Sequence, residues 1–533
     1  MSTLTGTGKL VRLILRRDRV IMPLWVLFIG LIPLSYVATI DELFPDAAGR
    51  LRYAMTSANN AGFVALYGGL RGSSLGELVA WRAGFIPVVI GLASILTVIR
   101  HTRTEEDSGR RELLGSTVVG RHAPLAAALV ATFGANVVLG LILAGGMVGQ
   151  DLPGTGSVTF GLEFALSGWI FAAVGAVAAQ LSGAAGNARG IAITTLGVAY
   201  VLRIVGDISA MSDGPLSWMT WLSPIGWAQR IRPYGDDSMW PALLVLVVGV
   251  LLAFVAVALS ARRDVGAGLL PTRPGPASST LGSPLRLAWR LHRGLLAGWV
   301  GGFVALGVVL GYLAEGVGEL VGDNQEMKDI FARMGGATGL IDSYLGGMLG
   351  LLGMIAGAYA IQAMLRARNE ELSGRAEPLL GTAVGRLRWV GSHLLFSLLG
   401  PAVTLAASGV AMGLTHGLNV RDVGGELPRL LGGAMVQLPA VWVLSAVAVL
   451  LFGLLPRFAA VAWMALTVCL LVGLVGQTLQ LDQWVLDISP FTHLPRLPGA
   501  EVAATPLVWL VAIAVVAGVV GLAGFRRRDI PVT

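Results

Sequence analysis

Two charged segments of the chain repeat the same residues at the same spacing. The first runs from Arg103 to Arg121 and the second from Arg368 to Arg386, and 12 of their 19 positions are identical when each residue is paired with the one 265 positions later. Mixed charges with a few leucines suit docking onto a soluble partner, because the charges set the register and the leucines fill a pocket. The alternative interpretation is a solvated loop.

Each segment is expected to form a helix end, a break at glycine and a second short helix. The helix end would hold two adjacent glutamates, and the short helix would hold an arginine and a further glutamate. The predicted docking residues are Glu105, Glu106, Gly109, Arg110 and Glu112 in the first copy and Glu370, Glu371, Gly374, Arg375 and Glu377 in the second.

The remaining residue types offer no catalytic or metal centre. Gly6 to Lys9 lacks the spacing of a phosphate-binding loop, so the chain is not expected to hydrolyse ATP. The six histidines are dispersed, and Cys469 is the only cysteine. The sequence predicts a chain that is not an enzyme and that binds no metal or cofactor of its own.

The elements that would position these segments are membrane spans. The composition is 55% hydrophobic and 13% charged, with a mean hydropathy of +0.75, whereas soluble domains carry about 25% charged residues. A spanning helix needs about 20 mostly apolar residues. The sequence predicts an all-α membrane protein with twelve transmembrane helices, at Val20–Ile40, Gly84–Ile99, Ala123–Gly149, Phe160–Leu181, Ile191–Val205, Trp240–Ser260, Leu295–Ala314, Gly346–Leu365, Val390–Leu414, Leu430–Leu455, Phe458–Leu479 and Pro506–Phe525.

Arginine clusters predict the orientation of these spans. They precede the first span and follow the even-numbered ones, and the positive-inside rule assigns such segments to the cytoplasm. Both termini are then cytoplasmic in a multi-pass protein of the bacterial inner membrane. The net charge of +7 is scattered over many short loops, which argues against a nucleic-acid partner.

Each half opens with a basic amphipathic segment. Such a helix lies in the cytoplasmic interface with its arginines toward lipid phosphates; a plain positive anchor is the alternative. The residues of these expected elbow helices are Arg12, Arg16 and Arg19, and then Arg286, Arg290 and Arg293.

Six spans in each copy make two parallel repeats, because an even number returns the chain to the side from which it started. The predicted domains are residues 1–265, a flexible cytoplasmic linker at residues 266–284 that is rich in Pro, Gly and Ser, and residues 285–533.

Charged residues inside the spans are few. Arg203 and Asp207 lie one turn apart near the predicted outer end of the fifth span. They would shape a substrate exit, or they would form an ion pair whose side chains reach the membrane surface.

The two charged segments resemble a known family motif. Glu105 to Leu114 is similar to the pattern E-E-x-x-G-R-x-E-L-L in the coupling loop of type V ABC exporter permeases, and Pro378 departs from it in the second copy. The fused, arginine-rich chain further resembles actinobacterial exporters of polyketide antibiotics of the tetronasin type.

This resemblance implies a multidrug efflux permease that exports lipophilic compounds, antibiotics or lipids. Two copies of a separate ATPase subunit, which bind ATP and Mg²⁺, would sit under the two coupling loops. A proton-coupled transporter of the major facilitator type is the alternative, although no carboxylate lies near a predicted span centre.

Overall fold

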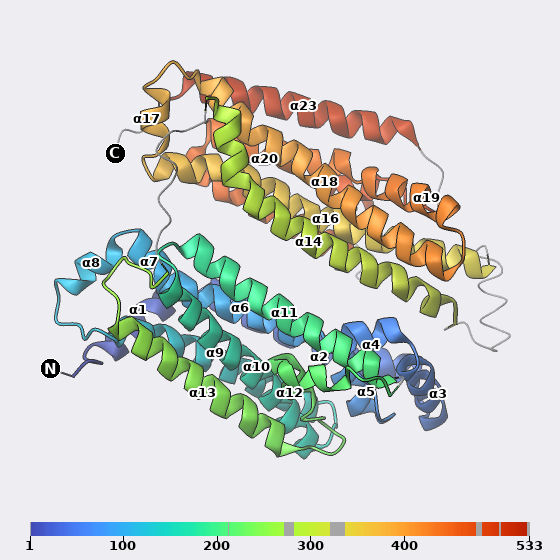
Figure 1. The fold of residues 1–533 in the computed structure, drawn as a ribbon. Helices are drawn as coiled ribbons and strands as arrows, with labels where there is room; N and C mark the ends of the chain where they lie inside the picture. Colours follow the sequence, from blue (N-terminus) through green and yellow to red (C-terminus); the bar gives the residue numbers. More distant parts are fainter. Residues whose placement is uncertain are drawn as a thin grey trace. The chain divides into compact units, whose positions relative to one another are not determined.

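The computed structural model describes residues 2–211, 213–270, 282–319, 336–475, 482–499 and 503–529. Its contacts divide the chain into unit 1, Met1–Gly275, and unit 2, Pro276–Thr533. The described residues form helices and loops without a β-strand (Figure 1). Residues 271–281 of the predicted linker lie outside the described ranges, and the predicted domain boundaries stay a prediction.

The described residues of unit 1 form thirteen α-helices and one 3-10 helix, η1. They are α1 (Thr7–Arg17), α2 (Ile21–Leu43), α3 (Ala47–Ala58), α4 (Ala61–Tyr67), α5 (Leu75–Arg82), α6 (Ile86–His101), α7 (Arg103–Asp107), α8 (Arg110–Gly115), α9 (Ala123–Val148), α10 (Gly154–Leu181), α11 (Ala185–Met211), η1 (Ser217–Leu222), α12 (Pro224–Gln229) and α13 (Met239–Ala261).

Unit 2 is built in the same style of long apolar helices and short connections. Its described helices are α14 (Pro284–Glu319), α16 (Gly336–Leu372), α17 (Ala376–Leu380), α18 (Arg386–Asn419), α19 (Val423–Met435), α20 (Leu438–Leu454), η2 (Pro456–Val461), α21 (Ala462–Val475), α22 (Gln483–Leu486), η3 (Pro490–His493) and α23 (Ala504–Arg527).

The twelve predicted spans are confirmed. Twelve helical stretches of the described residues are long and apolar enough to cross a membrane. Several are longer than the hydropathy pattern indicated, because polar first and last turns stay helical. The fifth runs over Ala185–Met211, where the sequence predicted Ile191–Val205.

Helix α10 is the centre of unit 1 and packs against α6, α9, α11 and α13. It approaches α9 closely where two glycines face each other. A Cβ atom on Gly140 would lie 2.6 Å from the carbonyl oxygen of Gly161, so only glycine permits this backbone contact.

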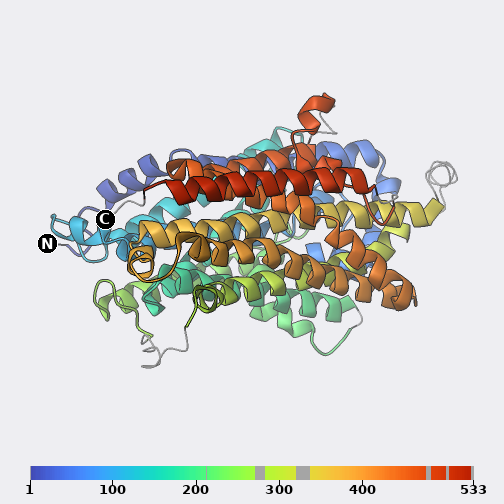
Figure 2. The same cartoon turned by 90° about the horizontal axis from the view of Figure 1, so that it is seen from above.

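In unit 2, helix α18 packs against α14, α16 and α19, and α20 packs against α16 and α23. Gly453 on α20 lies against the backbone of Gly521 on α23. Figure 2 shows α23, in red, running along the length of unit 2.

Each unit carries a short charged hairpin at one end. In unit 1 the hairpin consists of α7 and α8, and in unit 2 it consists of the end of α16 and α17. Helices α7 and α8 lie at one end of unit 1, beside α1, and α3, α4, α5 and α12 lie at the other; α17 lies at the end of unit 2 at which α23 ends (Figure 1). We call the hairpin-bearing end of each unit its hairpin end.

The start of the predicted linker is held against unit 1 instead of hanging free. The amides of Leu269 and Leu270 donate to the carbonyl oxygens of Gln180 and Leu181 at 3.1 and 2.8 Å. These backbone bonds tie the chain after α13 to the end of α10, so residues 266–270 depart from the prediction of a flexible segment.

Candidate functional site

The predicted break between two short helices is confirmed in unit 1. Helix α7 ends at Asp107, Gly109 has a φ of 71°, and α8 begins at Arg110. A positive φ is readily adopted only by glycine, so Gly109 sets the turn of this hairpin. Gly374, with a φ of 69°, takes the same conformation between α16 and α17 in unit 2.

Glu106 lies inside unit 1 instead of facing a partner. Its side chain is 0% exposed and its Oε2 accepts a hydrogen bond from Arg103 Nη1 at 2.7 Å. Arg263 donates to both carboxylate oxygens, at 2.7 and 2.8 Å, and Arg111 pairs with Oε1. A paired arrangement of two N–H donors on two oxygens is the strongest form of this ion pair.

The arginines around Glu106 join parts of unit 1 that are far apart in the sequence. Arg103 is fully buried, and its guanidinium donates to the carbonyl oxygens of Gly183, Gly266 and Ala267 at 2.5, 2.5 and 2.9 Å. Arg263 follows α13 and donates from Nε to Gln180 Oε1 of α10 at 2.8 Å. The hairpin is therefore fixed to α10, α11 and the segment after α13.

Burial lowers the pKa of two of these arginines. Desolvation lowers the pKa of Arg263. Burial, together with the charges of Arg263, Arg103 and Arg121, lowers the pKa of Arg111 to about 10. Several cations around one carboxylate repel one another, and the carbonyl oxygens that accept from Arg103 offset this repulsion.

The same contacts recur in unit 2, 265 positions later. Glu371 accepts from Arg528 Nη1 and Nη2 at 2.8 and 2.7 Å, as Glu106 does from Arg263. Arg386 donates to the Arg528 carbonyl oxygen at 2.9 Å, and Arg121 donates to that of Arg263 at 3.0 Å. We call the two clusters the hairpin locks: Arg103, Glu106 and Arg263, and Arg368, Glu371 and Arg528.

The outward faces of the hairpins hold the other predicted docking residues. The side chain of Arg110 is 51% exposed and that of Arg375 is 70% exposed, and Glu112 and Glu377 are also exposed. Leu113, at 73%, is an exposed leucine at the tip of the first hairpin. The sequence predicted one group of docking residues. The structure separates this group into buried residues, such as Glu106 and Glu371, and exposed ones, such as Arg110 and Arg375.

Glu105 and Glu370 lie between these inner and outer groups. Glu105 is 15% exposed and pairs with Arg110 at 3.1 Å and with Arg17 at 2.5 Å. Glu370 is 11% exposed and lies 3.6 Å from Arg375. Each glutamate thus orients the outward arginine of its own hairpin.

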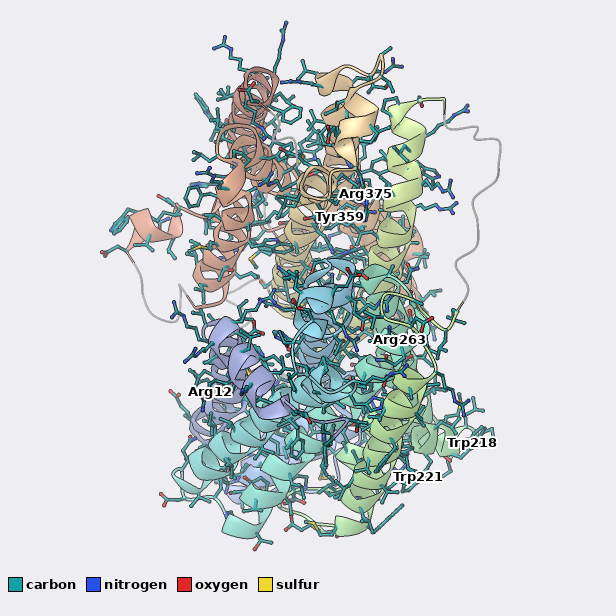
Figure 3. The ribbon with its side chains drawn as sticks, turned by 90° about the vertical axis from the view of Figure 1, so that its left-hand side faces the viewer. Arg12, Trp218, Trp221, Arg263, Tyr359 and Arg375 are labelled. Atoms are coloured by element: carbon teal, nitrogen blue, oxygen red, sulfur yellow. The ribbon has the colours of Figure 1, made fainter. Side chains whose placement is uncertain are left out.

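Local sequence patterns did not predict the arginines of the hairpin locks as partners of the glutamates. The sequence predicted no role for Arg263 or Arg528, because each lies 157 residues from its glutamate. Figure 3 shows Arg263 among the ribbons of unit 1 and Arg12 on α1 at its margin. The Arg-Asp pair at positions 263–264 and 528–529 was the available signal.

The first elbow segment forms a separate helix, α1, which packs on α9 through Leu10 and Ile14. Arg12, Arg16 and Arg19 are exposed. The chain turns after α1 at Asp18, which is buried and pairs with Arg100 at 3.1 Å and His101 at 2.6 Å.

The second elbow segment departs from the prediction of a separate helix. Arg286, Arg290 and Arg293 are exposed on α14, which continues without a break into the seventh span. The residue 274 positions after Asp18 is His292, which is buried on α14. Its Nε2 atom lies 3.0 Å from Nδ1 of His393. Among the residues that the structure describes, none forms an ion pair with His292 that would turn the chain.

Arg203 is buried in unit 1 and pairs with Asp207, which is partly exposed. The side chain of Arg203 is 0% exposed and its Nη1 lies 3.5 Å from Asp207 Oδ2. The guanidinium donates to the carbonyl oxygens of Val64, Ala65 and Leu66 at 3.0, 2.6 and 3.2 Å. Arg203 thus satisfies carbonyl groups near the end of α4. The predicted role of this pair, at a substrate exit or at the membrane surface, stays a prediction.

Comparison with known proteins identifies the family of this chain. A family model described as Multidrug efflux system permease Rv1217c, C-terminal domain, matches residues 12–260 and 281–526. The multidrug efflux system permease protein Rv1217c of Mycobacterium tuberculosis (strain ATCC 25618 / H37Rv) is 46% identical over 533 residues, which cover 99% of this chain and 96% of that protein. The chain belongs to this family of multidrug efflux system permeases.

Membership in the permease family decides between two interpretations of the sequence. The prediction of a multi-pass transport protein is confirmed, and the major facilitator alternative receives no support. Among the described residues, no group of three or more His, Cys, Asp or Glu side chains is placed to hold a metal ion.

Proposed function

We propose that this permease is the membrane subunit of an ATP-driven exporter of the type V ABC class, similar to exporters of polyketide antibiotics. It moves lipophilic compounds out of the cell across the bacterial inner membrane. ATP and Mg²⁺ bind to a separate ATPase, of which two copies contact the permease, one at each hairpin.

The observation that carries this proposal is the pair of hairpin locks. A docking helix transmits force only if it is fixed to the spans that must move. In both units a buried, doubly hydrogen-bonded glutamate joins the hairpin to the chain beyond the last span of the unit. The outward face of each hairpin is left exposed and charged, as a partner surface requires.

The orientation follows from the same hairpin ends. The basic clusters on α1, α7 and α8 lie at the hairpin end of unit 1, and those beside α17 and at the end of α23 lie at the hairpin end of unit 2. Arginine-rich segments stay on the cytoplasmic side. An ATPase that draws on cytoplasmic ATP meets the permease there. The opposite end of each unit then faces outward.

Transport in inverted vesicles tests the proposal. The permease, purified with its ATPase from the native host, is reconstituted and supplied with a lipophilic dye. Uptake that requires hydrolysable ATP and persists after the proton gradient is collapsed is expected. Uptake that follows the proton gradient and ignores ATP would contradict the ABC assignment.

A further inference from the structure

A polar cavity of about 250 Å³ lies in unit 1 at the end opposite the hairpin. The loop after α4, helix α5 and the segment after α12 form its walls, and α10 and α11 contribute one residue each. Its lining includes aromatic and apolar side chains, Tyr67, Leu70 and Trp81, beside several charged ones. A cavity inside one unit of a transporter that mixes these groups is a candidate ligand site.

Three of the four carboxyl groups that line the cavity are already engaged. Asp236 pairs with Arg232 at 2.5 Å. Asp207 accepts from Thr220 at 3.0 Å and pairs with Arg203. Glu77 closes the capping box of α5 and accepts from Ser74.

The fourth carboxyl group belongs to Glu163 of α10, which is 4% exposed. No described residue forms an ion pair with it. Glu163 adds a hydrogen-bonding group to the wall for a hydroxyl of a bound compound.

Two arginines in the cavity lack such partners. No hydrogen bond or ion pair joins the side chain of Arg71 or Arg230 to another described residue, and the buried Nε of Arg230 has no acceptor. The Arg230 guanidinium lies over the ring of Trp221 at 4.3 Å, which fixes its position without using its N–H donors.

The arginines are close enough to repel one another. Partial desolvation lowers the pKa of Arg71 and the charge of Arg232 lowers it further, whereas Asp236 and Asp207 oppose the shift. Burial also lowers the pKa of Arg230, where Asp207 opposes and Arg71 and Arg232 add to the effect. A ligand oxyanion between them would relieve this repulsion and fill the unused donors.

We propose that this cavity binds the carboxylate or phosphate group of an amphiphilic compound through Arg71 and Arg230. The apolar side chains Tyr67, Leu70 and Trp81 contact the adjoining hydrocarbon. This inference rests on the proposed function, because it assigns to the exporter a preference for lipophilic acids over neutral compounds of the same size.

Equilibrium binding to the full chain in neutral detergent tests the site. The probes are octanoate, octyl phosphate and the uncharged octanamide, measured by calorimetry. At least one of the two anions is expected to bind about tenfold more tightly than octanamide. The double variant Arg71→Gln/Arg230→Gln should lose this difference, and Arg52→Gln, which removes an exposed arginine of α3, should keep it.

Equal affinities for all three probes, or an unchanged anion preference in the double variant, would overturn the proposal. The double variant also removes the Arg230–Trp221 contact, and this loss could prevent folding. In that case Arg71→Gln alone is measured, because Arg71 is exposed and its replacement leaves that contact in place. Its expected effect is a severalfold loss of anion affinity.

The source of the oxyanion is distinguished in lipid nanodiscs. Octanoate binding that disappears when phosphatidylglycerol is added to phosphatidylcholine identifies a lipid headgroup as the occupant. Binding that persists identifies a free organic acid. Because binding is measured without ATP, its failure leaves ATP-driven export intact, and failed export leaves the binding result intact.

Discussion

At the scale of single residues, Glu106 and Glu371 are internal connectors. Each carboxylate is held by an arginine that follows the last span of its unit, and the side chains of these glutamates are 0% and 2% exposed. Breaking a buried pair by removing one partner leaves a charge without compensation. The glutamates therefore position the hairpins, and the exposed residues around them are the ones that can touch an ATPase.

Replacing the arginine of the first hairpin lock should destabilise unit 1. Arg263→Ala removes the paired donors of Glu106 but leaves Arg103 and Arg111 beside it, so the free energy of unfolding should fall by about 1–3 kcal/mol. Arg262→Ala, which removes the exposed neighbour, should change it by less than about 0.5 kcal/mol. Thermal unfolding followed by tryptophan fluorescence measures both, and equal effects would refute the assigned role.

The matching variant in unit 2 has a convenient reporter. Cys469 is the only cysteine and is buried, so a thiol-reactive dye labels it only when unit 2 opens. Arg528→Ala should allow labelling at a lower temperature than in the unaltered protein, because Glu371 loses its paired donors. Arg527→Ala is the control, and a shift of the same size in that control would contradict the prediction.

Arg203 should act on α4. Arg203→Leu removes the donors to three carbonyl oxygens, and Arg203→Lys keeps the charge but offers a single head group. Faster hydrogen exchange is expected at the amides that follow Tyr67, with the leucine variant faster than the lysine variant. Exchange confined to α11 would show that Arg203 does not hold α4.

At the scale of elements, the two hairpins share a shape but differ in how they are anchored. Arg111 ties α8 to Glu106 by an ion pair, whereas the residue at the equivalent position of α17 is Ala376, which is buried by apolar contact. The exposed Leu113 of the first hairpin has Pro378 as its counterpart. The repeated sequence predicted the two short helices. It did not predict that Ala376 would be buried by apolar contact where Arg111 forms an ion pair.

This difference predicts unequal coupling. The double variant Glu112→Lys/Leu113→Asp should lower substrate-stimulated ATP hydrolysis about tenfold or more, because it changes both the charge and the apolar contact of the first hairpin. Glu377→Lys should have a smaller effect. ATPase rates of the reconstituted complex measure both, and a larger loss in the Glu377 variant would reverse the assignment.

At the scale of the whole molecule, the sequence predicted the spans and the hairpins but not the contacts between distant segments. Hydropathy adds contributions from neighbouring residues, so it located all twelve spans. The pairing of Glu106 with Arg263 and the burial of Arg203 depend on how the helices pack, which local patterns do not record. The same reason explains why the second elbow segment does not form a separate helix. The spacing of its arginines matches that of the first, but His292 stands where the first has Asp18, the residue at which the chain turns.

The composition of the assembled transporter tests the central claim. Native mass spectrometry of the permease purified from its host should show two ATPase subunits for each chain. The triple variant Glu112→Lys/Leu113→Asp/Glu377→Lys should lose them while its spans stay folded. An ATPase content that is unchanged in this variant, or a functional exporter that contains no ATPase, would contradict the account.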